Sequence, residues 1–223
     1  MPSDLHNLPR PLIYLITSGQ TTEQTTPDGE DFTAVLQLIQ AAVTAQVDLV
    51  QIREKNLSAS VLYQLAMRAV KITKDTATKL LINDRSDIAA AADADGVHLT
   101  TTSLPTAVVR QSFGERFIIG VSTHSLEAAS LARRDGADFV VFGPVFATAS
   151  KEVYGEPLGL TQLTQVCAEL SPFPVLALGG VTKRNAPECF SAGAQGIAAI
   201  RELAQAETLA GIVAEIRRSF AIG

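Results

Sequence analysis

Short apolar runs alternate along the chain with segments of helical periodicity, and this alternation is the strongest constraint on the fold. The runs are rich in β-branched residues, as is typical of strands that are buried on both faces. We expect strands at Leu12–Thr17, Val47–Arg53, Lys79–Asn83, Gly96–Thr100, Phe117–Ser122, Asp138–Phe142, Pro174–Leu178 and Gly196–Ile200. We expect helices at Asp31–Ala45, Ser58–Asp75, Ser86–Ala94, Leu104–Phe113, Leu126–Asp135, Leu160–Leu170, Lys183–Ala192 and Ala206–Phe220. The N-caps of four of these helices are expected at Asp31, Ser58, Ser125 and Thr182.

Eight strand–helix units without an interrupting linker predict an α/β fold with a single (β/α)8 barrel. An open, doubly wound sheet is the alternative, and the count of eight favours closure. The whole chain, residues 1–223, is then one domain, and 47% apolar residues supply a sizeable core. Residues 1–10 are expected to form an N-terminal extension and residues 18–30 a flexible first βα loop.

The charge of the chain limits the classes of partner. A net charge of -5 argues against nucleic acid or a membrane surface as the main partner. Residues 1–10 lack the apolar core of a signal peptide, and no apolar run is long enough to span a membrane, so we expect a cytoplasmic protein. Cys167 and Cys189 resemble small core residues of a reducing compartment, although a disulfide between them stays open. A homodimer is one arrangement that the sequence allows.

The segment Gln51–Lys55 ends the second strand and carries two cations and an amide. Side chains alternate between the two faces of a strand, so Gln51, Arg53 and Lys55 are expected on one face and Glu54 on the other. A guanidinium and an ammonium side by side suit a phosphate or a diphosphate. The alternative is an ion pair from Arg53 or Lys55 to Glu54 or to a neighbouring helix.

Polar residues also follow other strands, and in such barrels the chemistry lies at the carboxyl ends of the strands. Asn83 and Asp84 follow the third strand, and a carboxylate beside phosphate-binding cations is a natural Mg²⁺ ligand. Capping of the helix that starts near Ser86 is the alternative role for this pair. After the sixth strand, Thr148, Ser150 and Lys151 lie in a loop that can close over an anion, unless the lysine is simply solvated.

Four further residues lie at or near the same predicted mouth. Gly179 and Gly180 follow the seventh strand, where backbone N–H groups of these barrels often approach a phosphate. His124 can be a proton shuttle or a hydrogen-bond donor, or it can cap the helix that begins near Ser125. His98 lies within a strand and is predicted to be a core histidine with its hydrogen bonds satisfied.

These segments together resemble the motif series of the thiamine phosphate synthase family, in order and over nearly the whole chain. The resemblance is carried by Gln51-Ile52-Arg53-Glu54-Lys55, Leu81-Ile82-Asn83-Asp84, Gly96-Val97-His98-Leu99, Gly120-Val121-Ser122-Thr123-His124-Ser125, Phe142-Gly143-Pro144-Val145-Phe146 with Thr148 and Ser150-Lys151, and Leu178-Gly179-Gly180. It implies a (β/α)8 barrel that joins hydroxymethylpyrimidine diphosphate to thiazole phosphate, with Mg²⁺ and with loss of diphosphate.

The resemblance also implies roles for individual residues. The family positions that match Gln51, Arg53, Lys55, Asn83 and Lys151 bind the pyrimidine diphosphate. The position matching Asp84 holds Mg²⁺, and the one matching Ser122 lies close to the reacting centre. Gly179 and Gly180 match glycines that help to hold the thiazole phosphate. Arg201 stands where a small residue commonly follows the eighth strand, and we expect it to be an additional phosphate ligand.

The chain departs from the family pattern at Ser103. The synthases usually carry a second metal carboxylate there, and a neutral hydroxyl should weaken Mg²⁺ binding. A serine is also similar to the sister family of thiazole tautomerases, in which the position matching His124 is the proposed acid/base. Lys55 and Asp84 favour the synthase, because proton transfer without a diphosphate does not require them. A non-catalytic phosphate-binding barrel is a third reading, whereas a Schiff-base aldolase would need a lysine inside a strand.

Overall fold

A computed structural model describes residues 10–148 and 156–221 of the chain. Its strands form a closed barrel in the order β1 to β8, with every neighbouring pair parallel. The strands are β1 (Leu12–Ile16), β2 (Leu49–Ile52), β3 (Lys79–Asn83), β4 (Gly96–Leu99), β5 (Ile118–Thr123), β6 (Phe139–Phe142), β7 (Val175–Leu178) and β8 (Gly196–Ala199). The predicted (β/α)8 barrel is confirmed, and the open doubly wound sheet is excluded because β1 pairs with β8.

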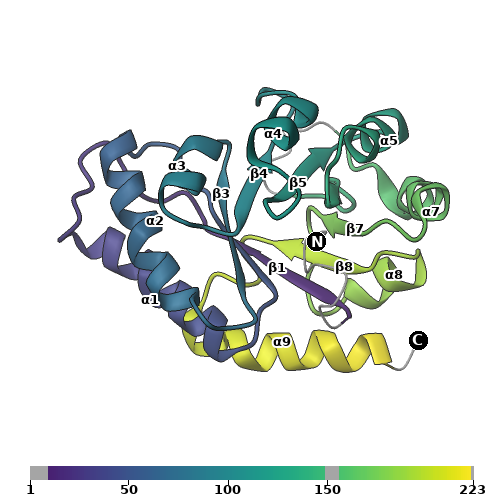
Figure 1. Ribbon diagram of the computed structural model, residues 1–223. Coiled ribbons are helices and arrows are strands. Elements are labelled where there is room, and N and C mark those ends of the chain that lie inside the picture. Colours follow the sequence, from purple (N-terminus) through teal and green to yellow (C-terminus); the bar gives the residue numbers. More distant parts are fainter. Residues whose placement is uncertain (1–9, 149–155, 222–223) are drawn as a thin grey trace.

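The helices lie around the outside of the strands (Figure 1). They are α1 (Glu30–Thr44), α2 (Ala59–Thr73), α3 (Ser86–Ala91), α4 (Thr106–Phe113), α5 (Leu126–Arg134), α7 (Gly159–Leu170), α8 (Ala186–Ser191) and α9 (Ala206–Ala221). The last helix, α9, packs between α8 and α1 and so covers the seam where the first and last strands meet.

Two of the four predicted helix caps are confirmed. The hydroxyl of Ser58 accepts the Val61 N–H at 3.3 Å, and that of Ser125 accepts the Ala128 N–H at 3.2 Å. The other two expectations are wrong. Gly29 is the N-cap of α1, and Asp31 lies one residue inside that helix. Thr182 lies outside α8 because its backbone N–H donates to the side chain of Asn185, which is the N-cap.

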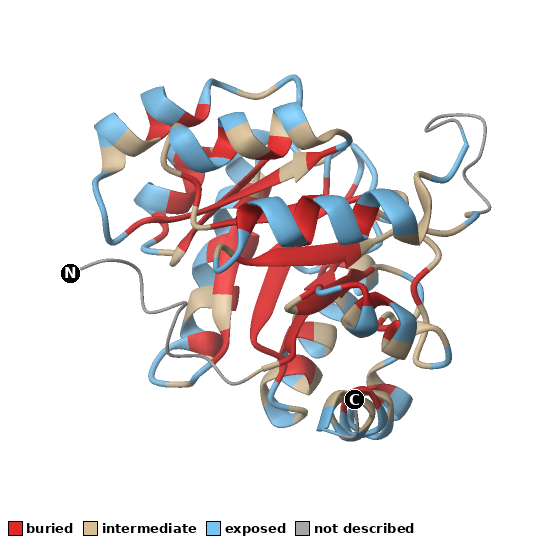
Figure 2. Ribbon diagram, turned by 90° about the vertical axis from the view of Figure 1, so that its right-hand side faces the viewer, coloured by how far each residue is buried: buried red, intermediate tan, exposed pale blue. Residues whose placement is uncertain are grey.

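Alternate residues of each strand enter two separate buried layers. Leu12, Tyr14 and Ile16 of β1 pack inside the barrel, whereas Ile13 and Leu15 pack between the barrel and the helices. Figure 2 shows the result, with buried strands at the centre and helices whose exposed faces point outward. Since both faces of each strand are covered, the strands read as continuous apolar runs in the sequence.

Both cysteines are buried and reduced, as expected of small core residues. Burial raises the pKa of Cys167 and of Cys189 to about 12, so neither thiol ionises at neutral pH. Within residues 10–148 and 156–221, no helix has the length and apolar character needed to cross a membrane.

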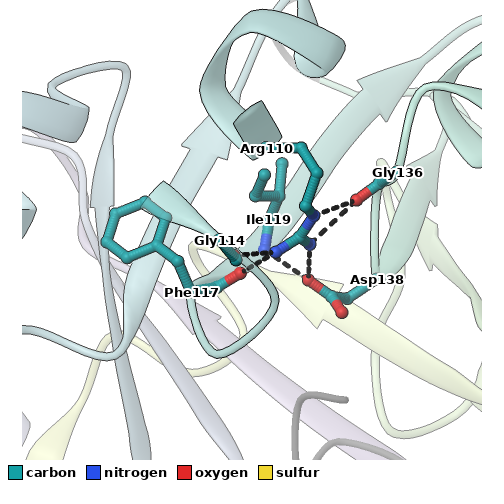
Figure 3. A network of polar contacts seen from close by, with 6 residues as sticks. All are labelled: Arg110, Gly114, Phe117, Ile119, Gly136 and Asp138. Carbon is teal, nitrogen blue, oxygen red and sulfur yellow. Dashed lines mark hydrogen bonds and ion pairs between the residues drawn. The ribbon is translucent and has the colours of Figure 1, made fainter. Parts of the chain in front are cut away.

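Arg110 of α4 organises the end of the barrel where the strands begin (Figure 3). Its guanidinium donates to the carbonyls of Gly114, Phe117 and Gly136 at 2.6–2.9 Å. It also donates to Asp138 Oδ2 at 2.7 Å, and the same oxygen accepts the Ile119 N–H. One largely buried side chain therefore ties together the segments that lead into β5 and β6.

We expect Arg110→Met to lower the free energy of unfolding by about 2–3 kcal/mol, because several carbonyls and a carboxylate lose their donor. Urea unfolding measures the change. Arg134→Met is the matched control, since Arg134 is exposed on α5, and its stability should stay close to that of the wild type. Equal losses in the two variants would contradict this role for Arg110.

Candidate active site

A cavity of about 590 Å³ opens at the carboxyl ends of the strands. Among the described residues, every predicted site residue except Asp84 lies in its wall: Gln51, Arg53, Lys55, Asn83, Ser122, His124, Thr148, Gly179, Gly180 and Arg201. Ser150 and Lys151 fall outside the described residues. The barrel thus brings these residues from six different strand ends to one mouth, as its topology requires.

The end of β2 shows the predicted alternation. Gln51, Arg53 and Lys55 point into the cavity, whereas the side chain of Glu54 is buried on the other face. The backbone N–H of Arg53 donates to the Thr17 hydroxyl at 2.8 Å, which fixes this turn of chain against β1. No ion pair joins Arg53 or Lys55 to any residue in the described part of the chain, so both cations are available to an anionic ligand.

Glu54 organises the loop between β1 and α1. Its carboxylate accepts the backbone N–H groups of Gly19 and Thr21, both at 3.1 Å, and the Thr21 hydroxyl at 2.7 Å. Asn56 adds a hydrogen bond to the Thr21 carbonyl at 3.0 Å. The chain therefore uses Glu54 to hold the first half of residues 18–30 at the rim of the barrel; the mobility of this loop stays a prediction.

Asp84 lies beside the cavity and faces Ser103. Its backbone is in the left-handed region, with φ of 67°, and its N–H donates to the His98 carbonyl at 2.9 Å. The Ser103 hydroxyl donates to Asp84 Oδ1 and accepts the Thr100 N–H at 2.6 Å. Arg85, not Asp84, is the N-cap of α3 and makes no side-chain capping bond, so helix capping does not explain Asp84.

Ser122 lies in the cavity wall and is hydrogen-bonded to a histidine inside the barrel. The Nε2 atom of His98 is 2.8 Å from Ser122 Oγ. His98 is 2% exposed and is a core residue, as predicted, but its Nδ1 atom is buried without a partner among the described residues. Burial and then the Arg53 guanidinium lower the pKa of His98 to about 3, so the imidazole is neutral.

His124 is held by the backbone of Gly143, the residue that follows β6. Its Nδ1 is hydrogen-bonded to the Gly143 carbonyl, and since a carbonyl only accepts, this nitrogen carries the proton. The helix that follows is capped by Ser125, so His124 is not needed as a cap. The second ring nitrogen has no hydrogen-bond partner among residues 10–148 and 156–221, so it can exchange a proton or a hydrogen bond with a ligand.

The glycine pair after β7 forms a turn that only glycine fits. Gly179 and Gly180 have φ of 94° and 63°. A Cβ atom at Gly179 would lie 2.5 Å from Pro144 Cα, and one at Gly180 would lie 2.6 Å from the Ala147 carbonyl oxygen. The N–H groups of Gly180 and Val181 donate to no other residue in the described ranges, so they are available to an anion.

Some wall residues were not among the predicted site residues. Thr101, Thr102, Pro144, Thr182 and Glu202 line the cavity. The position after a predicted strand was a usable signal for the threonines that follow β4. No sequence pattern pointed to Glu202, because its position is fixed by a contact between two loops. Its Oε1 atom, after β8, accepts the Lys183 N–H, after β7, at 2.9 Å.

The fold and the cavity define a (β/α)8 barrel with cationic side chains and a glycine turn at its mouth. Over residues 13–203 the chain matches the family described as thiamine monophosphate synthase. A thiamine-phosphate synthase of Chlorobium luteolum is 40% identical over 80% of this chain and 84% of that protein. One from Chloroflexus aurantiacus is 36% identical over 81% of this chain and 82% of the relative.

A solved structure supports the same assignment. The thiamine phosphate pyrophosphorylase of Pyrococcus furiosus superposes with a TM-score of 0.76 at 29% identity, covering 95% of this chain and 96% of that one. The protein belongs to the thiamine monophosphate synthase family, as its motif series predicts.

We expect Gly180→Ala to disturb this turn, because the new Cβ would contact Ala147 and Phe146 closely and φ is positive. The strain should lower the free energy of unfolding by about 1–3 kcal/mol and weaken the binding of inorganic diphosphate. Urea unfolding and titration calorimetry measure the two effects. Gly211→Ala in α9 is the control: its Cβ meets nothing within 4 Å, so stability should hold or rise and binding should not change.

Proposed function

We propose that this protein is a thiamine-phosphate synthase. It condenses hydroxymethylpyrimidine diphosphate with thiazole phosphate and releases diphosphate. The observation that carries the proposal is that one cavity wall contains Gln51, Arg53, Lys55 and Asn83. Neither Arg53 nor Lys55 forms an ion pair with a described residue, so both cations can bind a diphosphate. Family membership supplies the identity of the two substrates.

The reaction breaks one bond and forms one. The C–O bond between the pyrimidine methylene and the diphosphate breaks, and its electron pair leaves with the diphosphate. The resulting methylene cation is stabilised by the aminopyrimidine ring, and the thiazole nitrogen donates its lone pair to form the new C–N bond. No proton has to be removed, so the site needs charge stabilisation and alignment rather than a strong general base.

The side chains divide this work by charge and position. Arg53 and Lys55 balance the negative charge that grows on the leaving diphosphate, and Lys151 is proposed to join them. Gln51 and Asn83 supply amides to the pyrimidine end, and Ser122 lies next to the reacting atoms. Gly179 and Gly180 offer backbone N–H groups to the thiazole phosphate, with Thr148, Ser150 and Arg201 as further ligands.

The oxygens of Asp84 and Ser103 fit a magnesium ion, which would neutralise charge on the diphosphate. Both are hard ligands, and a serine hydroxyl ligates Mg²⁺ in other phosphate sites. Their hydrogen bond supports this arrangement, because it holds the two oxygens side by side next to the cavity. Mg²⁺ keeps several waters in most sites, so one carboxylate, a hydroxyl and substrate phosphates suffice.

The wider setting follows from the same proposal. The partners are small phosphorylated molecules, and neither nucleic acid nor a membrane surface is expected to bind to a chain of net charge -5. The location is proposed to be cytoplasmic, and a homodimer is an allowed assembly.

A thiazole tautomerase is the second candidate, and His124 is the observation in its favour. With Nδ1 held by the Gly143 carbonyl, His124 can exchange a proton at its other nitrogen inside the cavity. Incubation with both phosphorylated substrates, with and without Mg²⁺, separates the two. Thiamine phosphate supports the synthase, whereas EDTA-insensitive isomerisation of a thiazole carboxylate phosphate without condensation supports the tautomerase. Neither product would indicate a binding protein.

For the leaving-group site, we expect Arg53→Ala to lower kcat/KM by more than about tenfold, since a hydrogen bond to a charged group contributes roughly 1.5–3 kcal/mol. Steady-state formation of thiamine phosphate measures the effect. Arg134→Ala serves as the control, because that arginine is exposed on the outer helix α5. An unchanged kcat/KM in Arg53→Ala would refute its role.

For the metal site, we expect Ser103→Asp to lower the Mg²⁺ concentration needed for half-maximal condensation, because a second carboxylate joins Asp84. Asp84→Ala should nearly abolish condensation. Glu169→Ala is the control: Glu169 is exposed on the outer helix α7, and its loss should leave the Mg²⁺ dependence unchanged. In a tautomerase, Asp84→Ala would leave proton transfer intact, and His124→Ala would cost on the order of 10²–10⁴-fold.

A further inference from the structure

His98 is enclosed in the barrel and forms part of the cavity floor. Its ring lies 5.6 Å from the ring of Tyr14 and 6.1 Å from that of Phe139, measured between centroids. Its neighbour on the adjacent strand β5 is Gly120, where a Cβ atom would lie 2.8 Å from His98 Nδ1 and 2.3 Å from Phe139. A glycine in β5 is therefore what makes room for an imidazole at this level of the barrel.

The two ring nitrogens of His98 have different surroundings. Nε2 is 2.8 Å from Ser122 Oγ, which can accept or donate a hydrogen bond. Nδ1 is buried, has no hydrogen-bond partner within the described residues, and faces the backbone of Gly120. A buried ring whose described hydrogen-bond partner is a neutral hydroxyl suits the neutral imidazole, in which one nitrogen carries a proton and the other a lone pair.

This asymmetry decides where the proton lies. A proton on Nδ1 would be a buried donor with no acceptor, and such orphaned N–H groups are rare in folded proteins. A bare Nδ1 leaves only a lone pair against the Gly120 methylene, which is a tolerable contact. A proton on Nε2 has Ser122 Oγ as its acceptor, so the Nε2–H tautomer satisfies the only strong donor of the ring.

We propose that His98 is a positioning residue that donates Nε2–H to Ser122 Oγ and so turns the hydroxyl hydrogen of Ser122 into the cavity. Ser122 then acts as a hydrogen-bond donor to an acceptor atom of the substrate, a ring nitrogen or a phosphate oxygen. This assignment rests on the proposed synthase function, because that function places Ser122 next to the reacting atoms. His98 is part of the cavity floor, but it is only 2% exposed and its Nε2 is hydrogen-bonded to Ser122, so we expect it to act through Ser122.

Nitrogen NMR of the wild-type protein tests the tautomer without any assay of activity. The chain has three histidines, and the spectrum of His98→Gln identifies the signals of His98 in the ¹⁵N-labelled wild type. We expect a protonated Nε2 and a bare Nδ1, unchanged from pH 5 to pH 9. A proton on Nδ1, or an imidazole that titrates in this range, would overturn the proposal.

A double-mutant cycle tests the path through Ser122. His98→Met keeps an unbranched side chain of similar size but has no donor, whereas His98→Gln retains an N–H near the position of Nε2. We expect His98→Met to slow single-turnover condensation about tenfold, the upper range for one hydrogen bond, and His98→Gln to recover most of the rate. In a Ser122→Ala background the methionine should cost no more than about twofold.

The outcomes separate three cases. An equal loss from His98→Met in both backgrounds would show that His98 acts by packing alone, and the proposal would fail. Thermal unfolding of each variant measures that packing effect directly. A wild-type protein that makes no thiamine phosphate would refute the synthase function, while the NMR result would still decide how His98 and Ser122 share their proton.

Discussion

The closure of eight parallel strands imposes a two-residue alternation on every part of this molecule. Inside the strands, alternate residues enter the barrel interior or the layer under the helices. The same alternation continues past the end of β2, where Arg53 and Lys55 face the cavity and Glu54 faces away to hold the β1–α1 loop. The alternation of side chains along a strand therefore determines which residues form the core, directs Arg53 and Lys55 into the cavity, and directs Glu54 toward the β1–α1 loop.

Several polar side chains at the mouth are hydrogen-bonded in pairs, and in each pair one group holds the other in place beside the cavity. Ser103 binds Asp84, His98 binds Ser122, and the Gly143 carbonyl binds His124. Each pairing fixes one side chain through a partner that comes from a different strand or loop. Such preorganisation lets a site stabilise growing charge without first reorganising its own groups.

The sequence was sufficient for the fold and for most of the cavity wall. Apolar runs located all eight strands within two residues, because strands buried on both faces carry a strong pattern. Long-range side-chain hydrogen bonds were not visible in the sequence: Glu202 with Lys183 and His98 with Ser122 are 19 and 24 residues apart and meet only in the fold. Ser103 was noticed as a departure, but its hydrogen bond to Asp84 could only be seen in three dimensions.

The Arg110 network lies at the opposite end of the barrel from the cavity, and this separation matters for protein engineering. The residues that stabilise the fold and the residues that line the cavity are therefore different sets, connected by the strands of the barrel. Loops at the mouth can therefore be exchanged to accept new substrates while the far end keeps the barrel closed. Substitutions in the mouth loops can then change the chemistry of such a protein with little loss in the stability of its barrel.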